Sequence, residues 1–138
     1  MTALVWGIKA SLLDYVRGRG AGSVEAADGA TAEHDAFRFP AGSRTTGTDG
    51  AFLGSVTLTA HGGMLRLVIA EPAIVQSPGG WTLEVADPHE PGARLAFATI
   101  AAFDGERASG TALTQDGADL FFGPYEPGTP IDDPRVER

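Results

Sequence analysis

Two separate features of the sequence could carry chemistry, because hydroxyl, phenol and imidazole groups can hydrogen-bond a ligand or bind a metal. Ser11 and Tyr15 are four residues apart, so on a helix they share one face, beside an apolar stripe. His61 ends a stretch of alternating polar and apolar residues, immediately before Gly62 and Gly63. The pattern also fits a tyrosine that buries its ring and keeps its hydroxyl in water, and an ordinary surface histidine.

Other familiar signatures of catalysis or metal binding do not occur in the sequence. The glycine-rich run at residues 18–22 follows a predicted helix and precedes no phosphate-binding lysine, so we interpret it as a helix exit. There is no G-x-S-x-G nucleophile elbow, and His34, His61 and His89 do not have the spacing of zinc ligands. Pairs of acidic residues fall in predicted turns, where solvated carboxylates are common. No catalytic residue is predicted.

The composition restricts the class of protein. The chain has 138 residues, 43% hydrophobic and 20% charged, which predicts a single globular domain over residues 1–138. A formal net charge of −8 argues against binding to nucleic acid, which requires clustered positive charge. The absence of cysteine excludes disulfides, thiolate zinc sites and iron–sulfur clusters. No apolar stretch is long enough to span a bilayer.

Glycine and proline divide the chain into short pieces, a pattern typical of β-strands joined by tight turns. One helix is predicted at residues 7–17, with Ile8, Leu12 and Val16 on its apolar stripe. A polar loop is predicted at residues 44–50, a two-residue turn at Gly62 and Gly63, and a Pro-rich C-terminal tail at residues 126–138. Strands are predicted at residues 23–27, 35–39, 52–61, 64–70, 81–86, 94–103, 109–114 and 118–122. The predicted fold is mostly β (α+β), an antiparallel β-sandwich or open barrel with one N-terminal helix.

Three segments carry a resemblance to a known family. Residues 6–16 (WGIKASLLDYV) resemble the opening W-G-x-K-x-S-(x)3-Y-(V/I) motif of the HtaA domain family, the haem-binding modules of actinobacterial haem uptake. Residues 54–65 (GSVTLTAHGGML) resemble its second block, with a histidine before a glycine turn, and residues 122–129 (FGPYEPGT) resemble the closing block. The three blocks occur in the same order across nearly the whole chain. The resemblance implies a β-rich sandwich that holds haem against the helix.

The resemblance also implies a role for each candidate residue. By it, Tyr15 is the axial ligand to ferric haem iron, His61 hydrogen-bonds the tyrosine oxygen, and Ser11 contacts a haem propionate. A free phenol has a pKa of about 10 and is a poor anionic ligand at neutral pH, but the charge of Fe(III) favours the phenolate. A histidine that donates to the phenolate oxygen would fix its orientation.

Further residues are candidates for contact with the cofactor, which we expect to be ferric haem b. Lys9 and Arg66 are candidate partners of the propionates, and each is otherwise a solvated charge. Met64 lies just past the glycine turn, where it either pads the porphyrin face or fills the core. Tyr125 stands in a segment framed by proline and glycine and is predicted to form a structural corner.

The expected function is a non-catalytic carrier, chaperone or store of one haem, as a monomer or homodimer, with other haem-transport proteins as further partners. A peroxidase- or catalase-like enzyme on the same pocket is one alternative, although the sequence shows no convincing distal acid–base pair. A β-rich module that binds another protein without haem is the other. Residues 1–6 lack the regions of a signal peptide. We therefore expect a cytoplasmic protein if Met1 is the native start, and otherwise an exported one whose leader has been removed.

Overall fold

The computed structural model describes residues 2–19, 21–33, 36–42, 52–121 and 125–137. The strands in these ranges are β1 (Ala3–Trp6), β2 (Ser23–Ala27), β3 (Thr31–Glu33), β4 (Ala36–Pro40), β5 (Ser55–Ala60), β6 (Leu65–Ala70), β7 (Ala73–Ser77), β8 (Gly80–Ala86), β9 (Arg94–Phe103), β10 (Ala108–Leu113) and β11 (Arg135–Glu137). The helices are α1 (Ala10–Arg17), the 3-10 helix η1 (His61–Gly63) and α2 (Gln115–Leu120). None of these helices has the length and apolar character needed to cross a membrane. The prediction of a mostly β, antiparallel fold with an N-terminal helix is confirmed.

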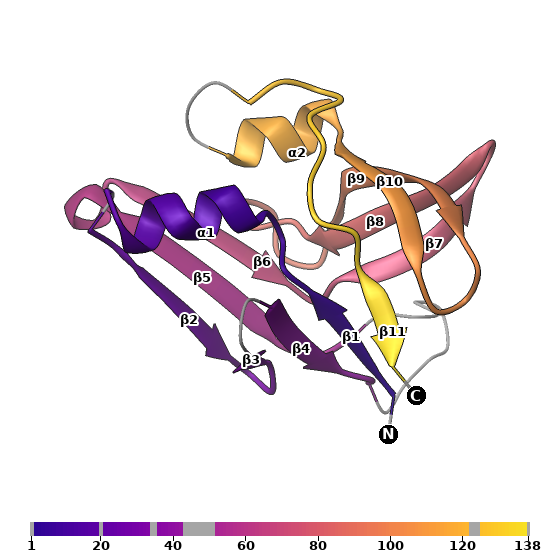
Figure 1. Cartoon of the computed structure of the whole chain (residues 1–138), viewed down its shortest axis with the longest axis horizontal. Coiled ribbons are helices and arrows are strands. Elements are labelled where there is room, and N and C mark those ends of the chain that lie inside the picture. The colour runs from indigo at the N-terminus through magenta and orange to yellow at the C-terminus, as the bar shows by residue number, and fades with distance from the viewer. Residues whose placement is uncertain (1, 20, 34–35, 43–51, 122–124, 138) are drawn as a thin grey trace.

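Within the described ranges the strands form three antiparallel sheets, in the orders β11–β1–β4–β3, β10–β9–β8–β7 and β2–β5–β6 (Figure 1). The C-terminal segment joins the first two sheets, because β11 pairs with β1 and Arg135 also bridges to Arg107, just before β10. The Pro-rich segment predicted as a tail therefore contributes a strand. Its pairing with β1 brings the two ends of the chain side by side.

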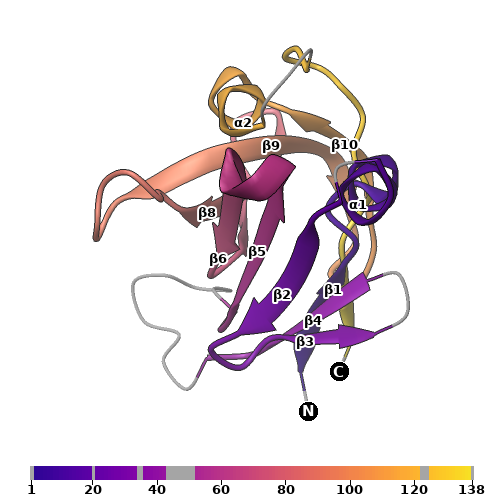
Figure 2. The ribbon, with the colours of Figure 1, turned by 90° about the vertical axis from the view of Figure 1, so that its left-hand side faces the viewer.

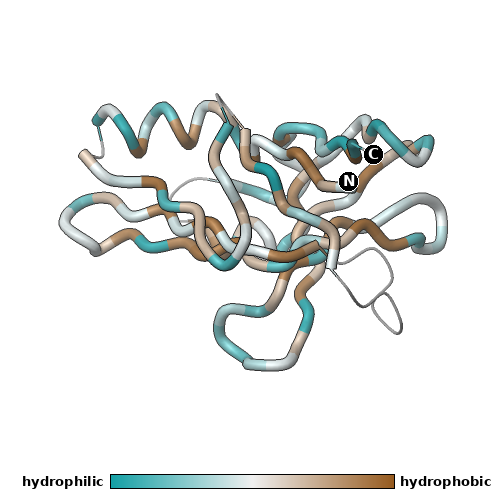
Figure 3. The backbone as a smooth tube through the Cα atoms, turned by 90° about the horizontal axis from the view of Figure 1, so that it is seen from below, coloured by the Kyte–Doolittle hydropathy of each residue, from teal (hydrophilic) through white to brown (hydrophobic). Residues whose placement is uncertain are grey.

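The β2–β5–β6 sheet follows the alternation that the sequence predicts. Along β5 the apolar side chains of Val56, Leu58 and Ala60 are buried, and the residues between them are partly exposed. The strand pairs with β2 on one side and β6 on the other. Along the described backbone, hydrophilic and hydrophobic stretches are interspersed (Figure 3). One face of this sheet therefore closes the core, and the other is accessible to solvent.

The sheets and α1 enclose an apolar core with large aromatic side chains. Trp6, Phe37, Phe39 and Phe97 are each at most 1% exposed. Trp6 packs edge-on against Phe97 with ring centroids 5.7 Å apart, and Phe97 packs similarly against Phe121 at 5.5 Å. Burying one such side chain contributes roughly 1.5–3 kcal/mol, and the edge-to-face geometry is favourable for aromatic rings. This core anchors β1, which is followed after a short connection by α1.

The N-terminal helix begins later than the sequence predicts, at Ala10 instead of residue 7. Ile8 has a φ of 61°, in the left-handed region, so the chain changes direction between β1 and α1. Ile8 is nevertheless fully buried. The side chain of Ile8 is therefore part of the core, although the residue lies before the helix.

Further differences concern short elements. The predicted strand at residues 118–122 is wrong in its described part, because residues 118–120 belong to α2 and Phe121 follows the helix. Thr114 caps this helix, because its Oγ1 accepts a hydrogen bond from Gly117 N at 2.9 Å. The strands β1, β3, β7 and β11 were not predicted. The predicted loop at residues 44–50 lies outside the described residues.

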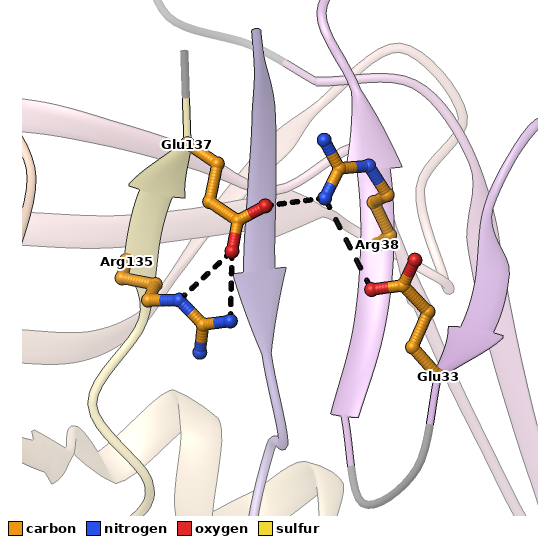
Figure 4. Close-up of polar contacts among 4 residues, drawn as sticks. All are labelled: Glu33, Arg38, Arg135 and Glu137. Carbon is orange, nitrogen blue, oxygen red and sulfur yellow. Dashed lines mark hydrogen bonds and ion pairs between the residues drawn. The ribbon is translucent and has the colours of Figure 1, made fainter.

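Charged side chains link the strands of the β11–β1–β4–β3 sheet (Figure 4). Arg38 on β4 donates to Glu137 on β11 and lies 4.0 Å from Glu33 on β3. Arg135 also donates to Glu137. The hydrogen bond from Arg38, followed by that from Arg135, holds the pKa of Glu137 below its ordinary value. Water screens these accessible groups, so they help to align the strands and contribute little to stability at neutral pH.

Candidate functional site

The structure brings two of the candidate side chains, Tyr15 and His61, into direct contact. Tyr15 Oη lies 2.6 Å from His61 Nε2, although the residues are 46 positions apart in the chain. Their rings are 5.7 Å apart between centroids and inclined by 59°. Which atom donates depends on the histidine tautomer: the phenol donates to an unprotonated Nε2, or a protonated Nε2 donates to the phenol oxygen. The pair lies on the surface, with Tyr15 39% exposed.

Helix α1 presents Tyr15 because its other face is buried. Leu12, Leu13 and Val16 pack into the core, which turns Tyr15 outward. Ser11 is exposed one turn before Tyr15, on the same side of the helix. The tyrosine is therefore on the solvent side of α1 and is not the buried-ring residue of the alternative interpretation.

The connection between β5 and β6 presents His61. His61, Gly62 and Gly63 have φ values of 53°, 68° and 94°, all in the left-handed region. Glycine adopts this region without steric cost. Met64 N donates to His61 O and closes the turn. The predicted two-residue turn is therefore a longer 3-10 turn, and β6 begins at Leu65 instead of residue 64.

A close approach of the backbone brings α1 next to this turn. Gly22 follows α1, and its N–H donates to Val16 O at 2.7 Å. A methyl group on Gly22 would overlap the carbonyl of Thr59, so only glycine allows β2 to start this close to β5. Beside it, Ser23 Oγ and Thr59 Oγ1 are hydrogen-bonded at 2.8 Å. The end of α1 and the end of β5 are thereby held side by side, as Figure 2 shows from the end of the helix.

The remaining candidates lie in different environments. Met64 is 85% exposed, so the interpretation as core filler is wrong. Arg66 is exposed on β6, where it pairs across the sheet with Thr59. Lys9 Nζ donates to Pro130 O at 3.1 Å and lies 5.7 Å from the ring centroid of Tyr125. Lys9 therefore holds the C-terminal segment, whereas Met64 and Arg66 follow closely on the turn that carries His61.

Tyr125, the other tyrosine, has a different environment. It is half-buried, and its ring packs edge-on against Phe121 with centroids 5.2 Å apart. Burial raises the pKa of the Tyr125 phenol, which disfavours the phenolate form. These contacts agree with a structural role for Tyr125.

Two residues that hydrogen-bond to the two ends of α1 were not singled out from the sequence. The first is Gly22, which was interpreted from the sequence as part of a helix exit. The second is Asp132, whose Oδ1 accepts a hydrogen bond from Ala10 N at the start of α1. The sequence does indicate that a distant residue must cap this helix. No Ser, Thr, Asp or Asn directly precedes it, so its first N–H groups need acceptors from elsewhere in the chain.

The fold and the site together define a β-rich domain that presents a hydrogen-bonded tyrosine–histidine pair from an N-terminal helix and a strand turn. The family model for HtaA (Htaa) matches residues 1–137, and the chain therefore belongs to the HtaA family. This is a haem-binding family associated with haem uptake. The comparison with curated proteins gives no match.

Solved structures agree with this assignment. The crystal structure of the C-terminal domain of HtaA from Corynebacterium glutamicum is 25% identical, with a TM-score of 0.76 over 98% of this chain and 93% of that one. The N-terminal domain of the same protein is 24% identical, with a TM-score of 0.74 over 98% and 94%. A domain-swapped dimer of a histidine-to-alanine variant of the C-terminal domain is 25% identical, with a TM-score of 0.64 over 96% and 92%.

Proposed function

We propose that this chain binds one ferric haem b, with the Tyr15 phenolate as axial ligand and His61 hydrogen-bonded to that oxygen. It acts as a haem carrier, chaperone or store and not as an enzyme. The observation that carries the proposal is the 2.6 Å contact between Tyr15 Oη and His61 Nε2 on an accessible surface. Membership of a haem-binding family supports the choice of cofactor.

The donor set fits a metal that a macrocycle already holds. In the part of the chain that the structure describes, no group of three or more His, Cys, Asp or Glu side chains could hold a bare metal ion. A single phenol oxygen does not retain a bare ion, but it can fill an axial position of an iron whose equatorial ligands are porphyrin nitrogens. When bound, ferric haem supplies a Lewis acid that favours an anionic oxygen ligand.

His61 adds to this site in two ways. A proton on Nε2 directed at the phenolate makes a charge-assisted hydrogen bond, which is stronger than a neutral one. The same contact fixes the direction in which the Tyr15 oxygen presents its remaining lone pair. Tyr15 is thereby prepared for a ligand on its exposed side.

Neighbouring residues complete the proposed site. Ser11 is exposed one turn from Tyr15 and is assigned to a propionate. Met64, exposed beside the His61 turn, is assigned to the porphyrin face, because a flexible thioether side chain packs well on an aromatic surface. Arg66 is assigned to the second propionate. Lys9 is left out of the haem contacts, because it donates to Pro130 O.

The carrier role is tested by loading the protein with haemin and mixing it with excess apomyoglobin as haem acceptor. We expect slow transfer of ferric haem and faster transfer after reduction with dithionite, because ferrous iron has a weaker preference for phenolate. We also expect peroxide turnover no faster than that of free haemin. Transfer at the same rate in both oxidation states would contradict phenolate ligation, and sustained turnover far above that of haemin would contradict the carrier role.

A further inference from the structure

Three polar groups of Asp132 contact the end of β1, the connection that follows it and the first residue of α1. Trp6 Nε1 donates to Asp132 O at 2.9 Å, and Asp132 N donates to Ile8 O at 3.0 Å. Ala10 N, at the first position of α1, donates to Asp132 Oδ1 at 3.2 Å. We call these three hydrogen bonds the Asp132 clamp. They connect the start of the helix to a residue more than 120 positions away in the chain.

The start of α1 depends on this distant acceptor. The residue at the N-cap position is Lys9, whose side chain donates to Pro130 O and carries no acceptor. The first turn contains no acidic residue. A carboxylate oxygen that accepts from a first-turn N–H satisfies an orphan donor and also interacts favourably with the helix dipole. Asp132 therefore supplies the cap that the local sequence lacks.

The clamp also holds an unfavourable backbone conformation. Ile8 has a φ of 61°, a value that a β-branched residue rarely adopts. Such a residue keeps this conformation only where its contacts with the rest of the fold outweigh the cost of the strained backbone. Its side chain is fully buried and its carbonyl accepts from Asp132 N, so both ends of the residue are held. The direction in which the chain enters α1 is set at this point.

The position of α1 matters because the helix is short and carries Tyr15. An eight-residue helix is marginal by itself, and its position depends on its tertiary contacts. Its C-terminal end is held by the bond from Gly22 N to Val16 O. We propose that Asp132 is a positioning residue that fixes the N-terminal end of α1, so that Tyr15 Oη meets His61 Nε2. For haem binding this inference rests on the proposed function, whereas for the chain without haem it stands alone.

The chain offers a matched control in the next residue. Asp133 Oδ1 accepts from Thr111 N at 3.0 Å, so Asp133 ties the same segment to β10 and not to α1. Asp132→Ala and Asp133→Ala therefore remove the same charge from adjacent positions. Asp132→Asn keeps an oxygen acceptor without the charge. Asp132→Ser keeps a polar side chain at this position and should disturb folding less than alanine does, but it is too short to restore a hydrogen bond that is already 3.2 Å long. Its first-turn amides should therefore exchange as they do in the alanine variant.

The first measurement uses the chain without haem. We expect Asp132→Ala to raise the hydrogen-exchange rates of the Ala10, Leu12 and Leu13 amides by about 3- to 30-fold, which corresponds to the loss of a helix cap. The same variant should shift the NMR signals of the His61 ring, because its contact with Tyr15 is disturbed. Asp132→Asn should restore both readouts, and Asp133→Ala should leave both as in the wild type. If Asp132→Ala does not fold, Asp132→Ser provides the same comparison.

The second measurement uses the loaded protein. Asp132→Ala should lose ferric haem to apomyoglobin several-fold faster than Asp133→Ala does, at a temperature where circular dichroism shows both variants to be folded. The inference is overturned if the two variants exchange their first-turn amides equally and leave the His61 signals unmoved. If the wild type does not bind haem through Tyr15, the proposed function fails, and the exchange and NMR results still decide the role of the Asp132 clamp.

Discussion

Replacing His61 measures how much the histidine contributes to a phenolate-bound haem. The contact between Tyr15 Oη and His61 Nε2 is short, at 2.6 Å, and becomes charge-assisted when the oxygen is a phenolate. A hydrogen bond to a charged group contributes about 1.5–3 kcal/mol. Since about 1.4 kcal/mol corresponds to a factor of ten, His61→Ala should lose ferric haem roughly 10- to 150-fold faster than the wild type.

The assay is stopped-flow transfer of haem to excess apomyoglobin, with two further variants to separate chemistry from backbone effects. His61 has a φ of 53°, which asparagine tolerates better than alanine does. His61→Asn therefore keeps the turn while removing the imidazole, and it should also lose haem faster than the wild type. His89→Ala removes an exposed histidine from a loop elsewhere in the chain and should have no effect.

The reasoning is refuted if His61→Ala and His61→Asn both lose haem at the wild-type rate. A loss that occurs only in His61→Ala, accompanied by lower stability of the haem-free chain, would assign the effect to the turn. The visible spectrum gives a second readout, because removing the donor to the phenolate should shift the ferric charge-transfer bands in both variants.

Further predictions concern stability, each measured by urea or acid unfolding of the haem-free chain. Gly22→Ala should lower the free energy of unfolding by about 1–3 kcal/mol, because its methyl group overlaps the Thr59 carbonyl; an unchanged midpoint would contradict the close approach. Thr114→Ala removes the N-cap of α2 and should cost about 1 kcal/mol, and unaltered stability would mean that the cap is not needed. The hydrogen bond from Arg38 lowers the pKa of Glu137 below its unfolded-state value of 4.5. The ionised Glu137 carboxylate therefore stabilises the folded chain above pH 4.5, and this contribution is lost as the pH falls through the lower folded-state pKa. Glu137→Gln should therefore weaken the loss of stability below pH 4.5, and an identical acid profile in variant and wild type would exclude this contribution.

The strands with strong local patterns could be predicted from the sequence. Residues 94–103 and 23–27 form β9 and β2 with the predicted bounds, and the alternation along β5 gives its buried face correctly. The elements that were missed depend on distant contacts. The strand β11 exists because it pairs with β1 at the other end of the chain, and α2 forms where Gly117 packs so closely on Phe97 that a side chain at Gly117 would overlap its carbonyl.

In the candidate site, too, local patterns predict some features and contacts between distant segments determine the others. Helical spacing placed Ser11 and Tyr15 on one face, and strand alternation placed His61 on the polar face beside a turn. Nothing in their spacing shows that Tyr15 and His61 meet, and that expectation came from the family resemblance. The contact depends on Gly22, through a backbone approach, and we attribute its alignment also to Asp132. Both effects arise between segments that are remote in sequence, where local patterns carry no information.

The most direct test of the proposed function is a haemin titration of the wild type, Tyr15→Phe and Tyr125→Phe, followed by visible absorption spectroscopy. Tyr125 is the matched control, because it is the other tyrosine in the sequence and its ring packs against Phe121. The wild type and Tyr125→Phe should saturate at about one haem per chain with a high-spin ferric tyrosinate spectrum, and Tyr15→Phe should lose that spectrum. If Tyr15→Phe binds haemin with the wild-type spectrum, Tyr15 is not the ligand and the proposal is wrong.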